Sequence, residues 1–127
     1  MNQYSRDQLV GQWVRNCQDE QGNPFVEHAE FFPDGSFEFC FMTMSLKGDI
    51  LEQTIEMGDW GLVGDVHFTI TKNEVVDENL YAADLNNADN YHAYQVTQLS
   101  ADSFSYQHLI SKESFILKRV IDNIGHC

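Results

Sequence analysis

Apolar and polar residues alternate along most of this chain with the two-residue period of β-strands. The clearest case is the segment 36–46, in which Phe37, Phe39 and Phe41 share one face. Turn-forming runs such as Pro33-Asp34-Gly35 separate the alternating segments. The pattern predicts about eight strands. The first begins in Leu9–Trp13, and the others are Phe25–Phe32, Ser36–Leu46, Ile50–Leu62, a strand from Val66 to about Thr71, Tyr91–Leu99, Ser103–Ile110 and Ser114–Ile121.

Two segments depart from this alternation. Ser5–Leu9 predicts one helical turn, with Ser5 as its N-cap. Residues 73–90 contain five acidic residues and no basic one, with apolar residues at helical spacing. They predict a loop with a short helix, which is either a lid over the end of the sheet or a solvated connection.

The short connections favour a single all-β domain over residues 1–127, as an antiparallel up-and-down barrel or a sandwich. With 127 residues, 43% of them hydrophobic, the chain is long enough for one packed core. Closing a barrel requires the first and last strands to pair, which brings Trp13 near Arg119.

Turn lengths predict which side chains share the interior. A three-residue turn at 63–65 pairs Trp60 with Phe68, and the hairpin around Ala101 pairs Tyr94 with His108 and Val96 with Tyr106. His92, Phe104 and Ile110 extend the face of Tyr94, Tyr106 and His108. Arg119 joins this face if the last turn has four residues, so that Ile110 opposes Phe115.

Three motifs resemble those of the lipocalin-like (calycin) superfamily. Gly11-Gln12-Trp13 is similar to the family's first motif, and Arg119 is similar to the basic residue of the last strand that packs over that tryptophan. Asp89-Asn90-Tyr91 is similar to the middle motif, although the usual Thr-Asp-Tyr is absent. The stretches Phe31–Phe37 and Gly58–Ile70 resemble small bacterial lipocalin-like domains. The resemblance implies a lipocalin-like barrel of eight strands with an internal cavity.

We therefore expect a binding protein that holds a small apolar or amphipathic molecule inside the barrel. The candidate ligand-binding residues combine rings with polar ends: Trp60, Phe68, Tyr94, Tyr106, His108 and Arg119. Three interpretations of this cluster remain open. The side chains bind a ligand, or they fill the small barrel of a protein-interaction module that works through its outer wall without a ligand, or His108 and a tyrosine serve as base and acid in an isomerase or cyclase.

Composition narrows the function classes. The chain has 20 acidic and 7 basic residues, a net charge of −13, which argues against nucleic acid and anionic membranes as partners. We find no known catalytic or metal-binding motif, so no catalytic residue, metal or cofactor is predicted. The three cysteines form no C-x-x-C pair. Together with the absence of a visible signal peptide, this favours buried thiols in the cytoplasm.

The sequence also gives a prediction for the outer wall of the barrel. If Phe37, Phe39 and Phe41 face the core, then Cys40, Met42 and Met44 point outward as an apolar stripe. A symmetric homodimer would cover this stripe on both copies. The alternative is a bulge near Phe41 that turns Met42 and Met44 inward.

Overall fold

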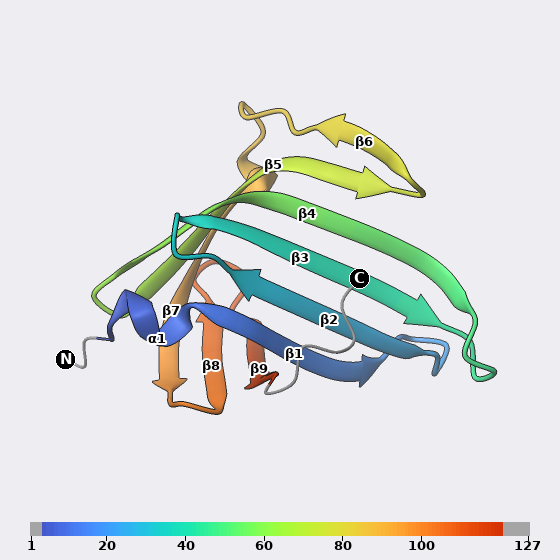
Figure 1. The fold of residues 1–127 in the computed structure, drawn as a ribbon, viewed down its shortest axis with the longest axis horizontal. Helices are drawn as coiled ribbons and strands as arrows, with labels where there is room; N and C mark the ends of the chain where they lie inside the picture. Colours follow the sequence, from blue (N-terminus) through green and yellow to red (C-terminus); the bar gives the residue numbers. More distant parts are fainter. Residues whose placement is uncertain (1–3, 121–127) are drawn as a thin grey trace.

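The computed structural model describes residues 4–120, and Figure 1 shows their arrangement. A short helix, α1 (Arg6–Leu9), precedes the first strand, and a single 3-10 turn, η1 (Ala88–Asn90), precedes the seventh. The nine strands of this part of the chain are β1 (Gly11–Gln18), β2 (Pro24–Phe31), β3 (Ser36–Met44), β4 (Ile50–Val63), β5 (Val66–Val76), β6 (Asn79–Ala82), β7 (Tyr91–Leu99), β8 (Ser103–His108) and β9 (Ser114–Arg119). Among the described residues, no helix is long and apolar enough to cross a membrane.

Eight of these strands close into an antiparallel barrel. The order is β4-β3-β2-β1-β9-β8-β7-β5, and β4 also pairs with β5, which joins the two ends. The all-β barrel predicted from the sequence is therefore confirmed. Strands β1 and β9 pair directly, with Trp13 opposite Arg119, as barrel closure requires.

The acidic segment 73–90 differs from its prediction. Instead of a short helix at Val76–Ala83, β5 continues to Val76 and turns through Asp77 and Glu78 into β6. Both turn residues have positive φ, 51° and 69°, as expected for a type I′ hairpin. The strand period therefore persists where the spacing suggested a helix. Figure 1 shows β6 beside β5, at the edge of the sheet order.

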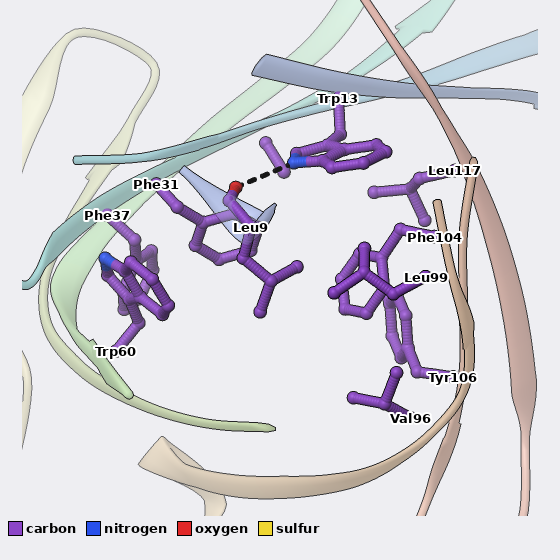
Figure 2. Packing of buried hydrophobic residues seen from close by; sticks show 11 residues of the cluster. Leu9, Trp13, Phe31, Phe37, Trp60, Val96, Leu99, Phe104, Tyr106 and Leu117 are labelled. Atoms are coloured by element: carbon purple, nitrogen blue, oxygen red, sulfur yellow. Dashed lines mark hydrogen bonds between the residues drawn. The ribbon is translucent and has the colours of Figure 1, made fainter. Parts of the chain in front are cut away.

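The hydrophobic core lies in the half of the barrel that α1 closes. Leu9 and Trp13 are fully buried there, beside Phe31, Phe37, Trp60 and Phe104 (Figure 2). The indole nitrogen of Trp13 donates a 2.9 Å hydrogen bond to the Leu9 carbonyl, so the helical turn and the first strand are tied together. The capping box of α1, in which Ser5 and Gln8 bond each other's backbone, fixes where the turn begins.

The turn between β4 and β5 is one residue shorter than predicted. Val63 pairs with Val66 around Gly64 and Asp65, with Gly64 at φ +63°. Because side chains alternate every residue, this slip exchanges the two faces of β5. His67 enters the interior, while the ring of Phe68 lies over Gly61.

The connection from β8 to β9 also differs from its prediction. Tyr106, not Ile110, opposes Phe115, and Ile110 lies in the turn with 86% of its surface exposed. The strand therefore ends at His108, and Phe115 takes a place on the inner face of β9.

The predicted outer stripe is only partly exposed. Cys40 is buried at 2% exposure, Met42 and Met44 are half-buried, and the register shift lies between Thr43 and Met44 rather than near Phe41. The prediction of buried free thiols is wrong for the two cysteines within residues 4–120. Cys17 is a free thiol but is exposed, and Cys40 is buried but disulfide-bonded.

Candidate functional site

A partly enclosed cavity of about 190 Å³ lies inside the barrel, on the side of the core away from α1. Each of the eight barrel strands contributes at least one side chain to it, so the cavity belongs to the barrel interior. The lining combines rings with titratable groups: Arg15, Glu27, Phe31, Phe39, Phe41, Glu56, His67, His92, Tyr94, Tyr106 and Phe115.

An ion pair forms one wall of this cavity. Arg15 and Glu27 are opposite each other on β1 and β2, and both Nε and Nη2 of Arg15 donate to Oε1 of Glu27, at 3.1 and 2.9 Å. The guanidinium also lies 5.1 Å from the ring centre of Phe115. Burial raises the pKa of the Glu27 carboxyl, and the attraction of Arg15 offsets only part of that effect.

A second carboxylate lines the cavity from β4. Oε1 of Glu56 accepts a 3.2 Å hydrogen bond from the hydroxyl of Thr71 on β5. Burial raises the pKa of Glu56, and the nearby charges of Glu74 and Glu27 raise it further. Within residues 4–120 no lysine or arginine forms a salt bridge with Glu56.

His67 is the deepest titratable group in the lining, with 2% of its surface exposed. Aromatic rings surround it, including Phe31 at 5.0 Å and Tyr94 at 5.7 Å between ring centres. Burial lowers its pKa to about 4, so the ring is neutral near pH 7. Its Nδ1 atom is buried and has no hydrogen-bond partner among residues 4–120.

Two histidines form a hydrogen-bonded pair beside the cavity. Nδ1 of His108 accepts hydrogen bonds of 3.1 Å from the backbone N–H groups of Ile110 and Ser111. A neutral His108 therefore carries its proton on Nε2, which lies 3.2 Å from Nδ1 of His92. His92 then carries its own proton on Nε2. Burial lowers the pKa of His92, and the neighbouring His108 lowers it further, while a backbone hydrogen bond at Asp89 opposes both.

Tyr94 and Tyr106 place two hydroxyl groups in the same interior. Their rings meet edge to face with centres 4.9 Å apart. Burial raises the pKa of both hydroxyls, so both stay protonated at neutral pH. They can therefore donate as well as accept hydrogen bonds.

A solved structure with a similar barrel is a lipocalin-like protein. It comes from Bacteroides uniformis ATCC 8492 and superposes with a TM-score of 0.53, at 18% sequence identity, over 89% of this chain and 99% of the other. The barrel has a lipocalin-like fold. No protein-family model and no curated protein matches the chain. At this level of identity the similarity establishes the fold alone, so the ligand must be argued from the cavity.

Only some of the six candidate residues predicted from the sequence lie at the cavity of the lipocalin-like barrel. Tyr94 and Tyr106 line the cavity, and the predicted pairing of Tyr94 with His108 is confirmed. His108 lies behind His92, and its two ring nitrogens are already engaged as described above. It is therefore poorly placed to act as a base on a ligand.

The other three candidates lie elsewhere. Trp60 packs in the core with its indole nitrogen 3.0 Å from the Phe32 carbonyl. Arg119 donates to three backbone carbonyls at the closed end, and Phe68 does not line the cavity.

Sequence reasoning missed the charged part of the lining, although a signal for it was present. Arg15 has the strand parity of Trp13, which places it on the interior face of β1. Glu27 interrupts the inward set of Phe25, Ala29 and Phe31 on β2. A charged residue within an apolar inward pattern is the feature that could have indicated a polar cavity.

Proposed function

We propose that this protein binds a small amphipathic molecule inside its barrel. The observation that carries the proposal is a cavity lined from every barrel strand whose polar groups are not all used by the fold. Eight-stranded barrels of this kind are wide enough to hold one small ligand. Burying a polar atom without a partner destabilises a protein, so an unpartnered Nδ1 of His67 favours a ligand that bonds to it.

The size and lining restrict the ligand. At about 190 Å³ the cavity is smaller than the roughly 300–1,000 Å³ typical of sites for drug-sized molecules. The phenylalanine rings offer contact to an apolar body, and Glu27, Glu56 and His67 offer hydrogen bonds to a polar end. A compact molecule with one polar group fits this arrangement better than a long-chain lipid.

The proposal is tested by titrating a panel of small aromatic and aliphatic fragments and following backbone amide signals by NMR. Saturable shifts at Glu56, His67 and Tyr94 support it. A larger outer groove of about 400 Å³, lined by Leu51, Val75 and neighbouring residues, is the internal comparison. Shifts confined to that groove, or no saturable binding anywhere, contradict the proposal.

A pair of variants separates interior from exterior binding. Phe41→Trp adds volume to a ring that lines the cavity, and Ile55→Trp adds a tryptophan to the outer groove. Phe41→Trp should weaken binding while Ile55→Trp leaves it unchanged, with melting temperatures showing that both variants fold. The opposite ranking places the ligand outside the barrel.

We also propose that the outer wall forms a homodimer contact through Met42 and Met44, which share the outward face of β3 with the buried Cys40. The support is the half-buried, apolar character of the two methionines. Light scattering of the wild type and of Met42→Lys at micromolar concentration tests the contact. A wild-type mass of one chain, or a Met42→Lys variant that stays dimeric, contradicts it.

A further inference from the structure

We infer that the molecule received by the cavity is a small organic amine in its protonated, cationic form. The inference rests on the proposed function, because it names the chemical class of the ligand for the same cavity. Three independent features of the lining carry it: the balance of charges, the balance of hydrogen-bond donors and acceptors, and the rings.

The lining has an excess of negative charge. It holds two carboxylates, Glu27 and Glu56, and one guanidinium, Arg15. Arg15 donates both of its hydrogen bonds to Glu27 to a single carboxylate oxygen, Oε1. Glu56 has a hydroxyl partner but no cationic one among the described residues. A partly buried carboxylate is stable when a cation lies beside it, and a bound ammonium group supplies that cation.

The polar groups that remain open are mainly acceptors. Oε2 of Glu27 and Oε2 of Glu56 have no partner among the described residues, and neither has the buried Nδ1 of His67, which accepts when the ring proton is on Nε2. The main cationic donor is in use, since Arg15 bonds Glu27 through Nε and Nη2. The tyrosine hydroxyls serve in either role. An ammonium group has only donors, so it is the complement of this set.

The aromatic rings of the cavity lining also favour a positively charged ligand. A cation is attracted to the face of an aromatic ring within about 6 Å. The barrel already uses this interaction twice for Arg15, over Phe115 at 5.1 Å and over Phe25 at 6.0 Å. Phe39, Phe41 and Tyr94 offer further rings toward the cavity. A carboxylate ligand finds the opposite situation, since Arg15 is committed to Glu27 and two carboxylates repel it.

The remaining charge of the chain acts in the same direction at longer range. The chain carries a net charge of −13. Glu74 and Glu113 also contribute to the electrostatic environment of the lining carboxylates. An acidic surface and an acidic interior raise the local concentration of small cations.

The test uses three probes of nearly equal shape and different charge: phenethylamine, phenethyl alcohol and 3-phenylpropionate. Cyclohexylamine and isobutylamine extend the cationic arm. Calorimetric titration at neutral pH should show at least one of the three cations binding about tenfold or more tightly than the neutral alcohol, with the carboxylate weakest. Equal or tighter binding of the alcohol or of the carboxylate overturns the inference while leaving the proposed function intact. Absence of binding by every cation overturns it as well, and absence of binding by neutral fragments too overturns both.

Glu56→Gln isolates the charge that the inference depends on. The amide keeps the shape and the contact with Thr71, so the variant should lose about tenfold or more in affinity for the cation and little for the alcohol. Glu38→Gln removes the same charge from the outer side of β3, away from the cavity lining, and should leave both affinities unchanged. Equal losses in the two variants would reveal only a long-range effect of net charge and would contradict a site at Glu56.

Discussion

The guanidinium of Arg119 lies 4.2 Å from the centre of the Trp13 ring, with the two residues opposite each other on β1 and β9. Arg119 also donates to the carbonyl oxygens of Gln8, Val10 and Ala101, at 2.6, 3.0 and 2.6 Å. One side chain therefore joins the helical turn, the first strand, the hairpin of β7 and β8, and the last strand. It holds the barrel closed at the end opposite the cavity.

Truncation of the buried ring should strongly destabilise this end. Trp13→Ala removes a fully buried indole and its hydrogen bond to Leu9, so we expect the free energy of unfolding to fall by about 3–5 kcal/mol. Urea denaturation at neutral pH measures it. A melting temperature within about a degree of the wild type would contradict the packing role of Trp13 at this end of the barrel.

The shape of the Arg119 guanidinium should contribute to stability in addition to its positive charge. Arg119→Lys keeps the cation over Trp13, but an ammonium group cannot reach three carbonyls in the geometry of the guanidinium. We expect a loss of about 1–3 kcal/mol in the free energy of unfolding. Lys118→Arg on the exposed face of β9 is the control and should change little. If Arg119→Lys is as stable as the wild type, the three hydrogen bonds contribute nothing measurable.

The arrangement at the closed end was predictable from the sequence because it follows from the order of the strands in a barrel. A barrel must pair its first and last strands, so Trp13 and Arg119 were expected to meet without any knowledge of side-chain packing. The pairing of Tyr94 with His108 followed in the same way from the hairpin around Ala101.

The cavity was less predictable, because a single turn length decides which face of β5 points inward. The turn at Gly64 and Asp65 allows either two or three residues, and both choices leave an alternating pattern of plausible side chains. The three-residue turn expected from the sequence places Phe68 inside, opposite Trp60. The structure places His67 there, and the resulting cavity is more polar than the predicted one.

A glycine on β4 should be nearly irreplaceable. A Cβ on Gly58 would overlap the carbonyl oxygen of Ile70, where the β4–β5 register shifts. Backbone cannot swing aside as a side chain can, so Gly58→Ala should lower the free energy of unfolding by about 3 kcal/mol or more. In Gly61→Ala the added methyl meets only the far end of the Phe68 ring. Its loss in a urea denaturation series should be clearly smaller, and equal losses would contradict the backbone explanation.

His67 should make the barrel sensitive to mild acid. Its pKa is about 4 in the folded state, lowered by burial from its ordinary value of 6.5. Between these pH values the unfolded chain therefore binds a proton at His67 and the folded chain does not. The free energy of unfolding falls as the pH drops below about 6.5 toward 4. For this one group we expect a loss of about 2 kcal/mol between pH 7 and pH 5.

His67→Leu is the matched variant, because leucine keeps the site apolar and removes the titrating ring. The raised pKa values of Glu27 and Glu56 act in the opposite direction, since a carboxyl that is protonated more readily in the folded state stabilises it in acid. Both carboxyls remain in the variant, so they cancel in the comparison. Urea denaturation of both proteins from pH 7 to pH 5 should show the wild type losing stability relative to His67→Leu. Parallel curves would mean that His67 accepts a proton while the barrel stays folded.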